Sequence, residues 1–175
     1  LGLVSVLLLL CYFLELRFAV WVAVGIPFAV CLSFLGLAAI DVTINAMSLT
    51  AIVLLMGILV DDAVVVSENV QRLRQEGMDL RTASVEGSAQ VAQPVIFSAL
   101  TTMLAFAPLM FIDGPNGDFM MPFPLAVIVL LLASLLESLC LLPGHLYHIP
   151  HRVTKERART FLRLRDWYSG KIEKV

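Results

Sequence analysis

The 175-residue chain is 59% hydrophobic, has a mean hydropathy of +0.91 and carries a formal net charge of −2 at pH 7. This apolar share exceeds the roughly 45–50% usual in soluble domains, and the apolar residues fall in long blocks, which indicates a membrane protein. The weak net charge does not favour a nucleic-acid partner. The three cysteines lie in apolar runs without the spacing of a disulfide framework or a metal site, so we expect no cofactor.

Five apolar blocks predict an all-α fold, a polytopic transmembrane helix bundle. The first block has only 14 residues, short of the ~20 that a spanning helix needs. No basic segment precedes this block and no small-residue cleavage site follows it, which argues against a signal peptide. We therefore expect a truncated helix, and a chain that is a fragment of a larger protein. The predicted spans are residues 1–14, 18–40, 46–70, 94–112 and 119–142.

Polar segments separate these blocks. Residues 41–45 and 113–118 predict tight turns. Residues 71–93 are polar and charged, and we expect 80–91 to form a short helix along the cytoplasmic membrane surface. The chain thus divides into a transmembrane bundle, 1–144, and a basic C-terminal amphipathic interfacial helix, 145–175, which would serve as a cytoplasmic linker.

The basic residues orient the predicted bundle. Arg17 follows the first span, three arginines follow the third, and the other eight Lys and Arg follow the fifth, so all twelve lie on one side. The opposite loops contain only Asp41, Asp113 and Asp118 as charged residues. The positive-inside rule places the basic side in the cytoplasm.

The third span contains two adjacent carboxylates, Asp61 and Asp62. A central Asp costs roughly +2.5 to +3.5 kcal/mol on membrane-insertion scales, so such a pair predicts a functional site. Helical periodicity places Asp61 on one stripe with Gly57, and Asp62 about 100° away. Gly57 would let another helix approach closely.

Two neighbouring carboxylates in a low-dielectric bundle cannot both remain ionised cheaply, which suits a proton carrier. No Lys, Arg or His occurs between Phe18 and Gln71, or in the fourth and fifth spans, so a counter-ion must come from outside this chain. The alternative interpretation is that the pair caps a helix at the membrane edge, but apolar residues 63–66 continue beyond it.

The run Gly57-Ile58-Leu59-Val60-Asp61-Asp62-Ala63-Val64-Val65-Val66-Ser67-Glu68-Asn69-Val70-Gln71-Arg72 resembles the fourth-helix signature of resistance-nodulation-division (RND) efflux transporters. The resemblance extends to Ile44-Asn45, Pro94 and Leu142-Pro143. It implies that the five spans correspond to the second to sixth helices of the amino-terminal half. The paired aspartates favour the hydrophobe and amphiphile (multidrug) branch over heavy-metal exporters, which usually have one aspartate here.

The resemblance also implies a function. It predicts a secondary active transporter, not an enzyme, in the bacterial inner membrane, where proton antiport through Asp61 and Asp62 drives drug export. A lysine from the missing carboxy-terminal half would pair with the aspartates. The missing periplasmic porter domains would select drugs, and a homotrimer would join a periplasmic adaptor and an outer-membrane channel.

Other polar residues in the spans have two interpretations each. Glu137 departs from the apolar pattern expected in the last span, and either pairs with a neighbouring helix or forms a second proton site. Ser98, Thr101 and Thr102 either line the relay or bond back to helix carbonyls. Glu68 and Asn69 are expected to be solvated at the interface.

Three rival functions remain. An intramembrane aspartyl protease needs facing carboxylates, whereas adjacent residues on one helix diverge by about 100°. A non-transporting membrane scaffold would explain the bundle but not its aspartates. A sterol-sensing or lipid-transport relative of the same superfamily shares a similar aspartate-bearing helix.

Overall fold

The computed structural model of the chain describes residue 14 and residues 16–147, and the regular structure of this part consists of helices without strands. The prediction of an all-α fold is confirmed for these residues. The predicted span 1–14 lies, except for Leu14, outside them, as does the tail from residue 148. Four helical segments are long and apolar enough to cross a membrane: Phe18–Ala39, Ala46–Gln75, Leu80–Phe111 and Pro115–Leu146.

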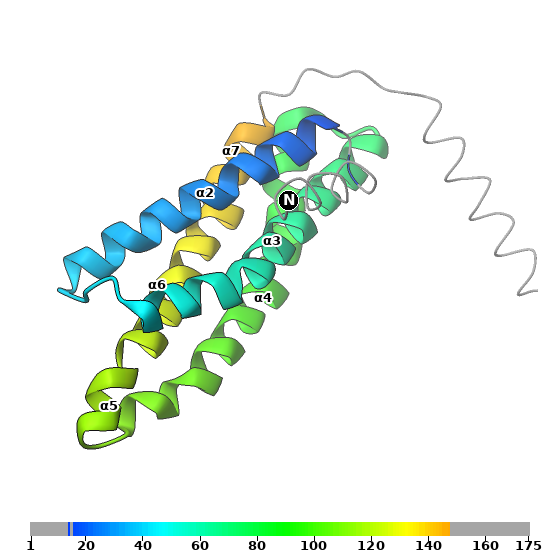
Figure 1. The fold of residues 1–175 in the computed structure, drawn as a ribbon. Helices are drawn as coiled ribbons and strands as arrows, with labels where there is room; N and C mark the ends of the chain where they lie inside the picture. The colour runs from blue at the N-terminus through cyan, green and yellow to red at the C-terminus, as the bar shows by residue number, and fades with distance from the viewer. Residues whose placement is uncertain (1–13, 15, 148–175) are drawn as a thin grey trace, which may run out of the picture.

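The elements follow one another as an up-and-down bundle (Figure 1). Helix α3 packs against α2, α4 and α6, and α6 also contacts α2 and α4. The elements are α2 (Leu16–Ala39), α3 (Ala46–Gln75), α4 (Leu80–Phe106), η1 (Ala107–Phe111), α5 (Pro115–Met120), α6 (Pro122–Leu136), η2 (Glu137–Leu141) and α7 (Leu142–Leu146).

Two apolar clusters form the core of the bundle. One surrounds Phe18 and Val70 near the end that carries the arginines, and the other surrounds Leu55 and Leu130 in the other half. Helix α3 contributes Leu59 to the second cluster and Ala63 to the first. The aspartate pair therefore lies at the boundary between the two clusters.

The predicted turn at residues 41–45 is present and ends in a reciprocal helix cap. The side chain of Asn45 accepts hydrogen bonds from the backbone N–H groups of Met47 and Ser48 at 2.9 and 3.0 Å. The Ser48 hydroxyl in turn accepts from the Asn45 N–H at 2.9 Å. Such a capping box satisfies N–H groups that would otherwise have no intrahelical partner, and so determines where α3 begins.

The segment after α3 differs from the prediction. Gly77, with a φ of 100°, ends α3, and Asp79 caps the next helix by accepting from the N–H groups of Arg81 and Thr82. From there α4 continues through Pro94 to Phe106, so the predicted surface segment 80–91 is the first half of one long helix. Proline removes one backbone hydrogen bond and often ends a helix, but membrane helices tolerate it where neighbours compensate.

The first half of α4 lies very close to α3. A Cβ atom on Gly87 would lie 2.9 Å from both Cα and Cγ2 of Val70, closer than side chains normally approach backbone. Beside this contact, the Asn69 amide donates to the Gly87 carbonyl at 2.7 Å and to Gln90 Oε1 at 3.2 Å. Asn69 therefore joins two helices, a role beyond the interfacial solvation expected from the sequence.

The last predicted span is interrupted. The predicted turn at residues 113–118 is partly helical, because α5 already begins at Pro115. Helix α6 ends at Leu136, and the five residues of η2 form a π-helix before α7 resumes α-geometry. The wider π-turn begins at Glu137, the acidic residue of this span.

Candidate intramembrane carboxylate site

The two adjacent aspartates have different environments. The Asp62 side chain is buried with 6% exposure, whereas Asp61 lies on the surface of the bundle. The Ser134 hydroxyl of α6 donates to Asp62 Oδ2 at 3.4 Å, a long hydrogen bond between two buried side chains. Because the two carboxylates point to different sides of α3, they do not form the facing pair that an aspartyl protease needs.

Asp61 belongs to an uncovered face of α3. The face contains large apolar side chains, among them Val53 and Leu54, which are 72% and 57% exposed. At its centre, Gly57 has no described heavy atom within 4 Å of where a Cβ would be. Glu68 lies further along the same face and is exposed, as expected. The exposed face of α3 comprises Leu49, Thr50, Val53, Leu54, Gly57, Asp61, Val65 and Glu68.

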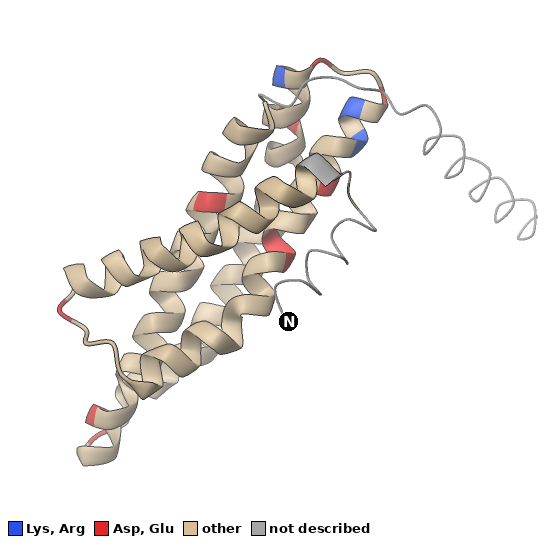
Figure 2. Cartoon of the chain, turned by 45° about the horizontal axis from the view of Figure 1, so that its top comes forward, with Lys and Arg blue, Asp and Glu red and all other residues tan. Residues whose placement is uncertain are grey.

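No described cation lies near the aspartates. Figure 2 shows Lys and Arg of the described residues only at one end of the bundle, here called the basic end, while acidic residues also occur partway along it. The basic end contains Arg72, Arg74 and Arg81. The one ion pair found among the described residues joins Arg72 to Glu76 at 2.7 Å, on the same helical stretch. Neither aspartate has a cationic partner within the described part of the chain.

The two threonine hydroxyls in the second half of α4 are bonded within their own helix. Thr101 and Thr102 donate to the carbonyls of Phe97 and Ser98, four residues earlier, at 2.7 and 3.1 Å. The structure thus shows the back-bonded arrangement for both threonines, and Thr101 and Ser98 are exposed. Ser134, which sequence reasoning did not single out, is the residue that contacts Asp62, because its position on α6 could not be related to α3 without the packing.

Glu137 occupies a second buried position. Its side chain is 3% exposed, and no described residue forms a hydrogen bond or ion pair with its carboxylate. It lies against Gly25 of α2, so close that a Cβ on Gly25 would overlap the carboxylate. The expected pairing with a polar group of a neighbouring helix is therefore not seen among the described residues.

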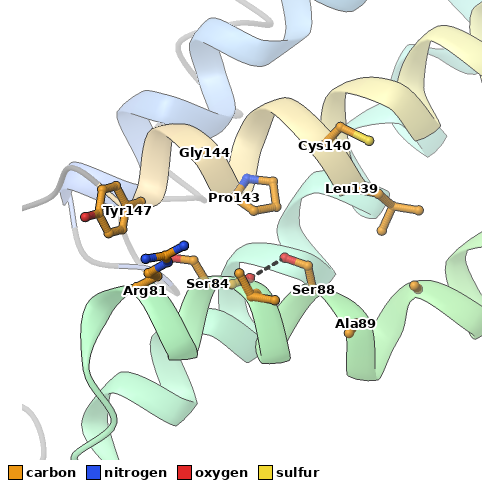
Figure 3. A pocket seen from close by; sticks show the side chains of 11 residues that line it. Arg81, Ser84, Ser88, Ala89, Leu139, Cys140, Pro143, Gly144 and Tyr147 are labelled. Carbon is orange, nitrogen blue, oxygen red and sulfur yellow. Dashed lines mark hydrogen bonds between the residues drawn. The ribbon is translucent and has the colours of Figure 1, made fainter.

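A cleft of about 660 Å³ lies between the first half of α4 and the η2–α7 segment (Figure 3). Its walls are mainly apolar, with Arg81 and Tyr147 together near one end. The Ser88 hydroxyl donates to the Ser84 carbonyl at 2.7 Å, whereas the buried Ser84 hydroxyl has no described hydrogen-bond partner. The described residues contain no group of three side chains suited to bind a metal ion.

Comparison with known sequences gives consistent matches. Residues 1–172 match the model of the AcrB/AcrD/AcrF family. The swarming motility protein SwrC of Bacillus subtilis is 30% identical over 142 residues, which cover 79% of this chain and 14% of that protein. The multidrug resistance protein MdtC of Pectobacterium atrosepticum is 37% identical over 142 residues, covering 78% and 14%. MdtC of Escherichia coli is 32% identical over 121 residues, covering 69% and 12%. The chain thus spans about 14% or less of the length of these curated relatives.

Proposed function

Because the chain belongs to the AcrB/AcrD/AcrF family of RND transporters, we propose that it forms part of the membrane domain of a proton-driven efflux pump, with Asp61 and Asp62 relaying protons. Two of the relatives above carry multidrug resistance names, which supports drugs or other hydrophobic and amphiphilic compounds as substrates. The observation that carries the proposal is the split pair, with one buried carboxylate and one on an uncovered helix face.

The two aspartates have separate tasks in this proposal. Asp62 is buried inside the bundle, where the Ser134 hydroxyl donates to it, and takes up the proton. Asp61 lies on the exposed face of α3, where a cationic side chain from the other half of the transporter pairs with it. Gly57 leaves room for that approach, because no described atom comes near it. Thr101 and Thr102 have no direct part, because their hydroxyls are bonded within α4.

Proton binding then selects between two conformations. With both carboxylates ionised, the cation is drawn to Asp61, and the helix that carries it docks closely on α3. With a proton on Asp62, that attraction weakens and the docked state loses its advantage. A ligand shifts such an equilibrium only by its differential affinity for the two states, and here the ligand is the proton.

The proposal includes partners and orientation. The other half of the protein and its porter domains complete the transporter. The complete transporter is a homotrimer that joins a periplasmic adaptor and an outer-membrane channel. The basic end faces the cytoplasm of a bacterial inner membrane. A cysteine at exposed Asn116 in α5 should react with an impermeant reagent from the periplasm, and one at exposed Gln75 should not. Reversed labelling would contradict this orientation.

Drug-susceptibility assays on the full-length parent test the function. Asp62→Asn and Asp61→Asn should each abolish resistance at matched expression, because an amide keeps the shape but carries no proton at accessible pH. Asp113→Asn, in the loop at the opposite end of the bundle, is the matched control and should export normally. Full resistance of both aspartate variants would refute the relay.

A further inference from the structure

The buried surface of α6 and η2 carries three polar side chains within about one helical turn. Ser134, Glu137 and Ser138 are 1%, 3% and 0% exposed. Residues three and four positions apart on a helix are neighbours, so both Glu137 and Ser138 adjoin Ser134. Ser134 is the residue whose hydroxyl reaches Asp62. These three residues are here called the α6 polar strip, and Ser134 is the end of the strip that contacts Asp62.

The strip leads from Asp62 towards the basic end of the bundle. The α6–η2–α7 segment runs towards that end, because its last residue, Leu146, packs in the same cluster as Phe18 and Val70. Glu137 is three residues beyond Ser134, a rise of about 4.5 Å along the axis. It lies one turn closer to the basic end than the Asp62 contact.

Two features show that Glu137 is accommodated as a carboxylate in this position. Gly25 on α2 leaves the space that the carboxylate occupies, since a Cβ there would overlap the Glu137 side chain in this conformation. The π-turn that begins at Glu137 changes the direction of the following side chains, and such turns are frequent at functional sites. An ionisable residue within a membrane span is costly, and such residues usually mark a functional site.

The far end of the strip is close to the cleft between α4 and α7. Leu139 and Cys140, which follow Ser138 directly, line that cleft. The buried hydroxyls of Ser138 and Ser84 have no hydrogen-bond partner among the described residues. Buried polar groups without a protein partner are the groups that ordered water satisfies. Ser84 lines the cleft itself, and Arg81 and Tyr147 lie near one end of that cleft (Figure 3).

We propose that Glu137 is the proton site next to Asp62, and that the α6 polar strip connects the aspartate to the cleft at the basic end. This inference rests on the proposed relay at Asp62. A proton passes from the Glu137 carboxyl group to the Ser134 oxygen, directly or through one bridging water molecule, while Ser134 gives its own hydroxyl proton to the Asp62 carboxylate. The net charge does not change, because Glu137 becomes ionised as Asp62 becomes neutral.

The charged groups around Glu137 are few. Helix α2 has no ionisable side chain between Phe18 and Cys31. Helix α3 carries Asp61 and Asp62 and, closer to the basic end, Glu68, Arg72 and Arg74, the last over the Phe18 ring. Among the described residues of α4, Glu86 is exposed, and on α7 His145 is exposed and stacked on Trp21 at 4.5 Å between ring centroids. Asp62, which Ser134 contacts, is thus the carboxylate to which the α6 polar strip leads from Glu137.

Export by the full-length parent, measured across a range of external pH, tests the inference. Glu137→Gln should reduce export about tenfold or more and flatten its pH dependence, because it retains the shape without the proton. Glu137→Asp should retain part of the export with a displaced pH profile. Glu86→Gln, an equivalent change on the exposed face of α4, should match the wild type.

Two results would overturn the inference. One is wild-type export by Glu137→Gln at every pH. The other is reduced export with an unchanged pH profile, which would show a structural role only. Asp62→Asn in the same assay separates the two proposals. If Asp62→Asn exports normally, the relay itself is wrong, and if it fails while Glu137→Gln matches the wild type, only the route through Glu137 is wrong.

Discussion

Replacement of Gly87 by alanine should weaken the contact that holds α3 and α4 together. The added Cβ would lie 2.9 Å from Val70 Cα and 3.1 Å from Val70 N, and neither backbone atom can rotate away. Ordinary carbon contacts are about 3.5–4.0 Å, so the helices must separate. Such overpacking costs roughly 1–3 kcal/mol.

Two smaller effects adjust this magnitude. Separation of the helices lengthens the 2.7 Å hydrogen bond from Asn69 to the Gly87 carbonyl, at a cost of about 1 kcal/mol. Alanine is favoured over glycine in a helix by about 1 kcal/mol, which offsets the lost bond. We therefore expect Gly87→Ala to lower the free energy of unfolding by about 2 kcal/mol.

The free energy of unfolding of the wild type and of Gly87→Ala is compared by equilibrium unfolding in mixed micelles, followed by far-ultraviolet circular dichroism. Gly57→Ala is the matched control, because no described atom lies within 4 Å of its Cβ position. The control should gain up to about 1 kcal/mol from helix propensity alone. If Gly87→Ala were as stable as Gly57→Ala, the close α3–α4 contact would be refuted.

Three further predictions concern α3 and its neighbours. Asn45→Ala should lower the free energy of unfolding by about 1 kcal/mol in the same assay, because α3 loses its capping box, and an unchanged value would contradict that role. Gly57→Leu should reduce export by the full-length parent about tenfold by blocking the docking face, although the chain alone stays folded, and normal export would show that no helix docks there. Hydrogen bonds from the side chain and backbone of Thr82 hold the pKa of Asp79 below 3.8, so its stabilising effect is present above that pH and is lost as pH falls through the lowered value. The difference in unfolding between wild type and Asp79→Asn should therefore shrink in acid, and a difference that grows would reverse the sign of this argument.

Much of the fold could be predicted from the sequence because long apolar blocks leave few alternatives to membrane helices. The turn before Ala46 was predictable for the same local reason, since Asn45 and its neighbours suit a turn and a helix start. The continuity of α4 through Pro94 was not predictable, because proline ends some helices and is accommodated in others. The four described spans thus follow from composition, whereas the continuous course of α4 through Pro94 does not.

The aspartate site was only half predictable. Helical periodicity states that Asp61 and Asp62 diverge, but it does not state which of them faces the core. Packing of α6 decides this, because Ser134 meets Asp62 and leaves Asp61 exposed. The π-turn at Glu137 and its contact with Gly25 also depend on packing between distant segments, and no local signal indicates them.

Proton flux measured in proteoliposomes containing the full-length parent tests the central claim most directly. With a drug supplied as substrate, the wild type should move protons when the drug moves, and Asp62→Asn should move neither. Asp113→Asn, a loop carboxylate remote from the pair, should behave as the wild type. Proton flux coupled to drug movement at the wild-type rate in Asp62→Asn would contradict the account.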